Sequence, residues 1–139
     1  MEFVDTNVLL YAISREPEEQ EKVERANEVL ESRNVGLSVQ VLQEFYVQAT
    51  RETRPAPLSH RQAFELVETF LGLPVQDLTT EIVLAALETR DRFGISYWDA
   101  AILEAARALR CDVVLSEDLT DGQDYDGVRV ENPFRGLDA

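Results

Sequence analysis

The sequence predicts an α/β fold in which a central parallel sheet of about five strands is flanked by helices. Three observations predict it: short apolar runs of strand length recur, helical patterns separate them, and capping or turn residues stand at the junctions. Such alternation is typical of parallel sheets, because two parallel strands need a crossover connection that is usually a helix. In these sheets the chemistry gathers at the carboxyl ends of the strands.

The composition is that of a folded protein with a buried core. The chain has 139 residues, of which 45% are hydrophobic and 29% charged, so we expect a single domain over residues 1–139. No apolar run approaches the roughly 20 residues that span a bilayer, and no signal sequence opens the chain. We therefore expect a cytoplasmic protein with no membrane association. The single cysteine, Cys111, is expected to be a buried structural thiol.

Apolar spacing and capping residues set the expected elements. Helices are predicted where apolar residues recur at helical spacing after a capping residue or proline, over residues 8–13, 17–33, 38–49, 59–71, 79–90 and 96–109. Strands are predicted at the short apolar runs between or after these helices, over residues 2–4, 35–37, 75–78, 113–115 and 128–130. Residues 51–58 and the Asp- and Gly-rich residues 121–127 are expected to be exposed connections.

Two acidic residues follow predicted strands closely. Asp5 comes directly after residues 2–4, and Asp118 comes shortly after residues 113–115. Because the carboxyl ends of parallel strands share one edge of the sheet, we expect both acids at that edge. Asp5 also fits the N-cap of the next helix. Glu117 competes with Asp118, since alternation along an extended segment sends neighbours in opposite directions.

Two further acids lie inside helices that begin at a serine. Asp99 shares a helix face with Ile102 and Leu103, where a carboxylate is costly unless it is paired, bound to a metal or near a helix end. The spacing Ser96-x-x-Asp99 also fits a capping box, so capping and catalysis are both open for Asp99. Glu44 lies at the edge of an apolar arc and, by itself, also fits a solvated helix residue.

A divalent cation is one explanation for converging carboxylates, and a solvated acidic surface is the other. Clustered carboxylates repel one another, which raises their pKa values, and a hard cation such as Mg²⁺ or Mn²⁺ relieves this repulsion through oxygen ligands alone. In phosphodiester hydrolysis, such ions activate a water and stabilise the phosphate and leaving oxygens. The sequence therefore favours metal-dependent phosphodiester chemistry if the acids converge.

Four motifs occur in a defined order along the chain. They are Asp5-Thr6-Asn7 after the first strand, Glu44 in a helix, Tyr97-Trp98-Asp99-Ala100 opening a helix, and Leu115-Ser116-Glu117-Asp118 after a strand. Their order and spacing resemble the PIN-domain family and, within it, the VapC-like toxins. The resemblance extends over nearly the whole chain, including a last strand near residues 127–134.

The resemblance implies a divalent-metal-dependent endoribonuclease that is the toxin of a toxin–antitoxin pair. It implies Mg²⁺ or Mn²⁺ as the cofactor, RNA as the substrate, a homodimer, and a small antitoxin protein whose tail enters the active-site groove. Asp5 and Asp99 would be the principal metal ligands. The implied catalytic and metal-binding residues are Asp5, Glu44, Asp99 and Asp118, supported by Thr6, Asn7 and Ser116.

Two features fit an RNA-cutting protein less comfortably. The net charge of −14 repels a polyanion at long range. Residues 121–126 add three more acids near the proposed centre, which we interpret as a solvated turn rather than as extra ligands. Contact with RNA would depend on local arginines. The candidates are Arg15, Arg51, Arg54, Arg90 and Arg92.

Other functions fit the residues less well. His60 is the only histidine, which excludes cleavage by a pair of histidines. A phosphoacceptor signalling domain would need a lysine at a strand end, and the one lysine, Lys22, is predicted to lie elsewhere. A haloacid-dehalogenase-like phosphatase would have a second aspartate where this chain has Asn7. A catalytically inactive PIN-like binding domain stays open, although all four acids are present.

Overall fold

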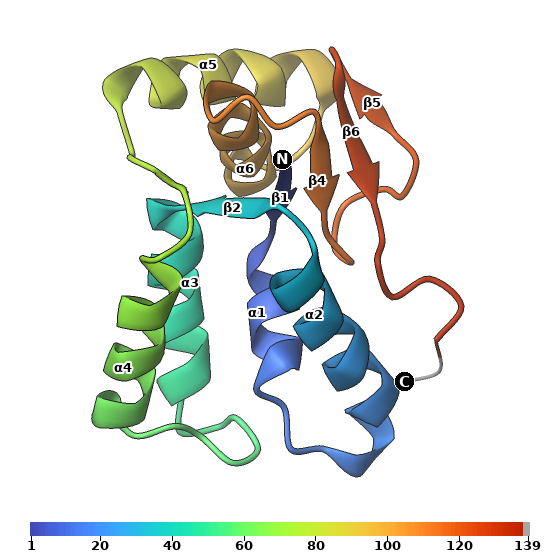
Figure 1. Ribbon diagram of the computed structural model, residues 1–139. Helices are drawn as coiled ribbons and strands as arrows, with labels where there is room; N and C mark the ends of the chain where they lie inside the picture. The colour runs from blue at the N-terminus through green and yellow to red at the C-terminus, as the bar shows by residue number, and fades with distance from the viewer. Residues whose placement is uncertain (138–139) are drawn as a thin grey trace.

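The structure is a computed structural model that describes residues 1–137. Six strands form its sheet, in the order β3-β2-β1-β4-β6-β5 (Figure 1). The strands are β1 (Glu2–Val4), β2 (Val35–Ser38), β3 (Val75–Gln76), β4 (Val113–Leu115), β5 (Asp124–Tyr125) and β6 (Val128–Glu131). The helices are α1 (Thr6–Ala12), α2 (Gln20–Ser32), α3 (Val39–Thr50), α4 (His60–Phe70), α5 (Thr80–Phe93) and α6 (Tyr97–Ala108), with a 3₁₀ turn, η1 (Pro17–Glu19).

Five of the six strands run parallel, which confirms the predicted α/β fold. The exception is β5, which is antiparallel to β6. The sequence prediction of a plain loop over residues 121–127 is wrong at this point, because Asp124 and Tyr125 pair with β6. Asp126 and Gly127 have φ angles of 54° and 93°, and two consecutive positive φ angles are what a tight two-residue hairpin turn requires.

Helices cover both faces of the sheet. In Figure 1, α5 and α6 lie on one side of the sheet, and α1 to α4 lie on the other. α6 contacts β2, β3, β4 and β6, and α5 packs on α6; on the opposite face α1 packs against α2 and α3, and α3 against α4. The arrangement is a three-layer, doubly wound α/β fold. No helix within residues 1–137 is both long enough and apolar enough to cross a membrane.

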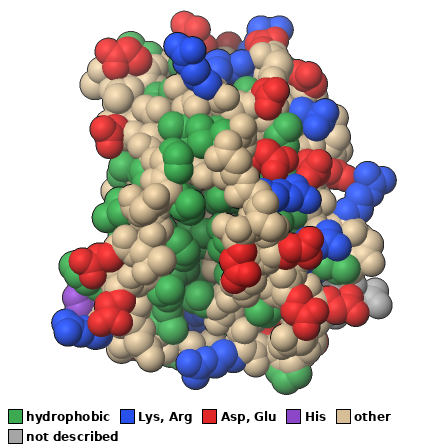
Figure 2. All heavy atoms as spheres, viewed as in Figure 1, with side chains coloured by type: hydrophobic (Ala, Val, Ile, Leu, Met, Phe, Trp, Pro, Cys, Tyr) green, Lys and Arg blue, Asp and Glu red, His purple; other side chains and the backbone are tan. Residues whose placement is uncertain are grey.

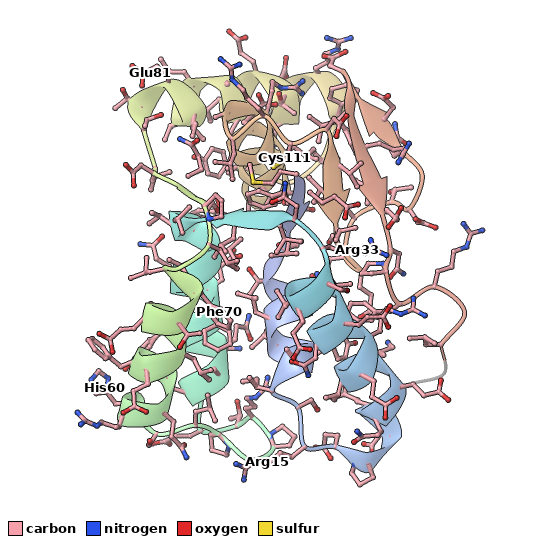
Figure 3. All side chains as sticks on the ribbon, viewed as in Figure 1. Arg15, Arg33, His60, Phe70, Glu81 and Cys111 are labelled. Carbon is pink, nitrogen blue, oxygen red and sulfur yellow. The ribbon has the colours of Figure 1, made fainter. Side chains whose placement is uncertain are left out.

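The core lies between the sheet and the helices. Phe3 of β1 and Leu115 of β4 are fully buried, as are Phe45 of α3 and Leu103 of α6 on opposite faces. Burial of one such side chain stabilises the fold by roughly 1.5–3 kcal/mol. The ring of Phe45 meets that of Phe70 edge to face, with 5.2 Å between centroids, so α4 is attached to α3 by aromatic packing. Phe70 is labelled on α4 in Figure 3.

Two potentially reactive side chains have structural surroundings. Cys111 is a buried free thiol, as predicted, and burial raises its pKa, which disfavours the reactive thiolate. His60 lies at the outer side of α4 (Figure 3), where its Nδ1 and the Tyr46 hydroxyl form a hydrogen bond of 2.8 Å. Neither residue lies at the carboxyl ends of the central strands.

The order of the strands reverses between β1 and β4. From β1 the chain continues to β2 and β3 on one side, whereas β4 and β6 are added on the other. A reversal of this kind leaves a crevice at the carboxyl ends of the two central strands. Val4 is opposite Leu115 in the register, so Asp5 and Ser116, the next residues of the two strands, lie side by side.

Candidate active site

Asp5 stands at the junction of β1 and α1 and is 7% exposed. Its backbone N–H donates to the Leu115 carbonyl at 3.0 Å. Its Oδ1 accepts from the backbone N–H of Thr6 at 2.7 Å, so Asp5 is the N-cap of α1. Its Oδ2 accepts from the Ser116 hydroxyl at 2.7 Å. The same carboxylate therefore caps a helix and stands at the crevice between β1 and β4.

Ser116 and Asn7 connect Asp5 to Asp118. Ser116 is fully buried, and its Oγ accepts from the Asp118 backbone N–H at 3.1 Å. The Asn7 amide donates to Ser116 Oγ at 3.2 Å and to Asp118 Oδ2 at 3.3 Å. These two neutral side chains thus hold two carboxylates from separate strands in one hydrogen-bonded group.

Glu44 comes from the middle of α3, across the crevice from β4. The Thr6 hydroxyl donates to its Oε1 at 2.6 Å, and the Gln40 amide donates to its Oε2 at 3.3 Å. Gln40 also donates to the Trp98 carbonyl at 3.3 Å, which ties α3 to the start of α6. Glu44 is therefore a fixed, half-buried carboxylate rather than a freely solvated one.

Asp99 lies in the first turn of α6. The helix is capped by Ser96, whose Oγ accepts from the Asp99 backbone N–H at 3.0 Å. The cap uses the backbone of Asp99, and the carboxylate of Asp99 lines the same hollow as Asp5.

These acids line one small hollow of about 160 Å³ at the switch point of the sheet. The four carboxylates come from four parts of the chain that are far apart in the sequence. The lining side chains are Asp5, Thr6, Asn7, Leu10, Glu44, Gln48, Trp98, Asp99, Ile102 and Asp118. The structure therefore brings together all four acids singled out from the sequence, with two of the three supporting residues in the wall and the third, Ser116, behind Asp5.

The carboxylates affect one another electrostatically. Burial raises the pKa of Asp5 from 3.8 to about 6; hydrogen bonds from Ser116 and Thr6 oppose this rise, and the charges of Asp118 and Glu44 add to it. Burial also raises the pKa of Asp99, a hydrogen bond with Ser96 opposes the rise, and the same two charges add to it. Ionisation of these carboxylates is therefore disfavoured by burial and by their mutual repulsion, and a bound cation would relieve both effects.

The donor chemistry of the hollow fits a hard divalent cation. Beside three apolar or aromatic residues, its lining offers carboxylate, hydroxyl and amide oxygens, and oxygen ligands are those that Mg²⁺ and Mn²⁺ prefer. Among residues 1–137, no three acidic, histidine or cysteine side chains already stand in the geometry of a metal site. Mg²⁺ keeps several of its waters and needs only one or two carboxylates directly, so this side-chain set remains compatible with it.

Glu117 takes a different direction from Asp118. Its carboxylate accepts from the Tyr11 hydroxyl and from Lys22 Nζ, each at 2.6 Å. It does not line the hollow of the four acids but an adjoining one. Lys22 lies in α2 and not at a strand end, as predicted, but its ammonium group reaches the residue that precedes Asp118. The sequence shows no direct sign of how α2 packs across β4.

The three acids of residues 121–126 have partners outside the hollow. Asp121 accepts from the Asn132 backbone N–H at 2.8 Å and forms an ion pair with Arg135. Asp124 accepts from the Gly127 backbone N–H, and Asp126 forms an ion pair with an arginine of α5. These acids stabilise the hairpin and the C-terminal turn, in agreement with their interpretation as a turn rather than as ligands.

Sequence reasoning missed three residues that hold the site. Gln40 precedes Glu44 by four positions, one helical turn, and this spacing could have identified it. Lys22 occupies the same helix face as Ala26 and Val29, all three buried, and a lysine in an apolar stripe is a signal for a buried partner. Tyr11 carries no comparable signal.

Of the arginines proposed for RNA contact, Arg54 shares a hollow with one of the four acids, Asp118. It lines the adjoining hollow of about 260 Å³, which shares Asn7, Leu10 and Asp118 with the acidic one. Arg15 lines a separate hollow beside α4 (Figure 3), and Arg92 is paired with Asp126. Arg51 and Arg90 line none of these hollows.

The fold and the acidic hollow define an α/β protein with a carboxylate centre at its switch point. The sequence matches the PIN domain family over residues 3–120, and the chain therefore belongs to that family. The match includes all four acids of the hollow. A comparison with curated proteins gave no match.

Solved structures of toxin–antitoxin proteins have a similar fold. DNA-bound VapBC from Salmonella typhimurium contains a chain that is 26% identical, with a TM-score of 0.63 and 95% of this chain and 97% of that chain covered. A toxin–antitoxin complex from Klebsiella pneumoniae gives 18% identity, a TM-score of 0.69 and coverage of 96% and 98%. Mycobacterium tuberculosis VapC20, a sarcin–ricin loop cleaving toxin, gives 20% identity and a TM-score of 0.67, with 85% of this chain and 90% of that chain covered.

Proposed function

We propose that this protein is a divalent-metal-dependent endoribonuclease and the toxin of a toxin–antitoxin pair. One observation carries the proposal: four carboxylates from four elements line a single hollow at the switch point of a PIN-domain sheet. Two of them have raised pKa values. Such a cluster has no evident structural use that a less costly side chain could not fill, and its charge suits a cation.

Each residue of the hollow has a proposed part. Asp5 and Asp99 would be the principal ligands of Mg²⁺ or Mn²⁺, and Glu44 and Asp118 would complete the centre. The ion would supply an activated water and charge stabilisation at the phosphate. Thr6, Asn7 and Ser116 orient the carboxylates by the hydrogen bonds that they donate, which is the support that metal ligands need to keep their geometry.

RNA is the substrate that the comparisons favour. VapC20, which shares the fold, is named a sarcin–ricin loop cleaving toxin. The strong negative charge of this chain means that attraction of the RNA must be local. Arg54, in the hollow that adjoins the acids, is the best placed of the arginines to contact a phosphate.

An antitoxin partner is proposed because similar structures are complexes of toxins with antitoxins, some of them on DNA. Large apolar side chains are exposed on this chain, and an apolar strip runs down the centre of the face in Figure 2, with acidic and basic side chains around it. Contiguous exposed apolar surface marks sites of protein association. Over the chain as a whole, the exposed large apolar residues include Val47 of α3, Phe64 of α4, Leu71 directly after α4, and Leu84 and Leu87 of α5. We also propose a homodimer, a single domain and a cytoplasmic location.

Cleavage of RNA by matched variants tests the proposed function. The wild type is expected to cut a single-stranded RNA in Mg²⁺ or Mn²⁺ and to stop on addition of EDTA. Asp99→Asn is expected to lower the rate by about 100-fold or more, because it replaces a charged ligand with a neutral one. Asp91→Asn, an exposed acid on α5, is the control and should cut normally.

The outcome also separates the proposed enzyme from an inactive PIN-like binding protein. Equal activity in the Asp99→Asn and Asp91→Asn proteins would refute the metal mechanism. No cutting by the wild type, with Mn²⁺ bound, would favour the binding protein instead.

A further inference from the structure

Glu117, Tyr11 and Lys22 form a closed triangle of hydrogen bonds beside the acidic hollow. Tyr11 donates to Glu117 Oε1 at 2.6 Å, and Lys22 Nζ donates to Glu117 Oε2 at 2.6 Å and to the Tyr11 hydroxyl at 3.2 Å. The ammonium group also lies 4.8 Å from the centroid of the Tyr11 ring. We call these three residues the Lys22 clamp.

Lys22 is the buried member of the clamp, and Tyr11 and Glu117 are half-buried. Lys22 is the only lysine of the chain and is 7% exposed. A buried ammonium group that lost its partners would be strongly disfavoured, so the cation holds Glu117 tightly in place. Tyr11 of α1 and Lys22 of α2 thereby fix the position of Glu117 in the segment that follows β4.

The segment that Lys22 and Tyr11 hold is otherwise supported by side chains, including the buried Leu119 and the Asn7 amide, which donates to Asp118 Oδ2. Within residues 1–137, the backbone of Glu117, Asp118 and Leu119 forms no hydrogen bond with another backbone group. The Glu117 backbone N–H donates to Asn7 Oδ1 at 3.2 Å, and the Asp118 backbone N–H donates to Ser116 Oγ at 3.1 Å. Side chains alone therefore determine the path of the segment.

Glu117 and Asp118 are consecutive residues of the bend that follows β4, and their carboxylates have different partners: Lys22 and Tyr11 for Glu117, and Asn7 for Asp118. Glu117 lines the hollow that also contains Arg54, and Asp118 lies between that hollow and the hollow of the four acids, because it lines both. Since the two residues share one planar peptide bond, holding Glu117 in place restricts where the Asp118 side chain can lie.

We infer that Lys22 and Tyr11 are positioning residues, which act through Glu117 to hold Asp118 at the metal centre. The inference deepens the proposed function and rests on it, since it concerns how one of the four acids is oriented. It also assigns a use to Lys22, a buried cation near the acids. That cation neutralises Glu117 and leaves the charge of the hollow itself unpaired.

Amide exchange tests the clamp without metal or RNA. The backbone amides of Glu117 and Asp118 are expected to exchange faster in Tyr11→Phe than in the wild type, because that variant loses only the hydroxyl and keeps the ring contact with Phe134. Tyr46→Phe, which loses a hydroxyl bonded to His60, is the matched control and should exchange at residues 117 and 118 like the wild type. Equal exchange in the Tyr11→Phe protein and the wild type would overturn the inference.

Mn²⁺ affinity tests the consequence for the metal centre. Lys22→Met is expected to weaken Mn²⁺ binding about tenfold, the lower end of what loss of a supporting residue costs a metal site, and Lys22→Arg should restore most of the affinity. Arg107→Met is the control for stability, because it also leaves a buried acid, Glu104, without its cation, at a site away from the hollow. Its Mn²⁺ affinity should be unchanged.

Different results would contradict the Lys22 clamp and the proposed metal centre. Wild-type affinity in the Lys22→Met protein, with weakened binding in Asp118→Asn, would overturn the clamp and leave the metal centre standing. Unweakened binding in Asp118→Asn would overturn the clamp as well, because Asp118 would then not serve the metal. If the wild type bound no Mn²⁺, the proposed function would fail, and the amide exchange would decide whether the clamp exists.

Discussion

At the scale of single residues, the polar side chains of the hollow have two uses each. Asp5 caps α1 with one oxygen and accepts from Ser116 with the other. Thr6 begins a helix and also donates to Glu44. A capping role and a ligand role are therefore compatible for one residue, which is why spacing alone could not choose between them.

The raised pKa of Asp5 predicts how the stability of metal-free protein depends on pH. The pKa is 3.8 ordinarily and about 6 in the folded chain, so the folded state holds more protons between these values. The free energy of unfolding therefore falls as the pH rises through this window, by about 3 kcal/mol from this group. Asp5→Asn lacks the group and keeps the acceptor for the cap.

Denaturation of both proteins in EDTA at pH 4 and pH 7 measures this effect. The Asp5→Asn protein is expected to gain stability relative to the wild type between these pH values. A difference in unfolding free energy that does not change with pH would show that Asp5 titrates normally.

At the scale of elements, most of the fold was predictable because local patterns determine it. Apolar periodicity and the caps Ser38, Ser59, Thr79 and Ser96 predicted the helices, and the structure begins helices after each of these residues. The hairpin that contains β5 was missed because β5 has only two residues and so shows no strand periodicity, although the pair Asp126-Gly127 is a sequence signal for a two-residue hairpin turn and could have identified it.

The site was predictable in its acids and less so in its supports. The ends of β1 and β4 are set by local sequence, so Asp5 and Asp118 could be placed on one edge. The contact of Gln40 with Glu44 is local, one helical turn apart in α3, so the sequence carried a signal for it. The contact of Lys22 with Glu117 depends on where α2 packs relative to the end of β4, which no local pattern specifies.

Two variants can separate the capping of α6 by Ser96 from the proposed ligand role of Asp99, the third residue of that helix. Ser96→Ala is expected to lower the free energy of unfolding by about 1 kcal/mol, because the Asp99 N–H loses its acceptor. Asp99→Asn keeps that N–H and should retain most of the stability in EDTA. Chemical denaturation of both variants measures this. A larger loss in Asp99→Asn than in Ser96→Ala would mean that the carboxylate is chiefly structural.

At the scale of the whole molecule, the net charge influences how RNA associates with the protein. The net charge is −14, and Figure 2 shows acidic side chains distributed around one face with basic ones among them. Screening shortens the range of this repulsion to about 10 Å at 0.1 M salt. Most nucleic-acid binders lose affinity as salt rises, and this chain should behave differently.

The dependence of RNA cleavage on salt tests this expectation. At fixed Mg²⁺, kcat/KM for a short single-stranded RNA is expected to hold or rise as NaCl increases from about 20 to about 150 mM, since salt screens the repulsion. A steep fall over this range would show that a local basic surface dominates the encounter instead.

Calorimetric titration with Mn²⁺ tests the metal centre most directly. The wild type is expected to bind the ion, Asp5→Asn and Asp99→Asn are expected to bind at least about tenfold more weakly, and Asp91→Asn should bind like the wild type. Binding of equal strength in all four proteins would contradict the claim that these acids form the metal centre.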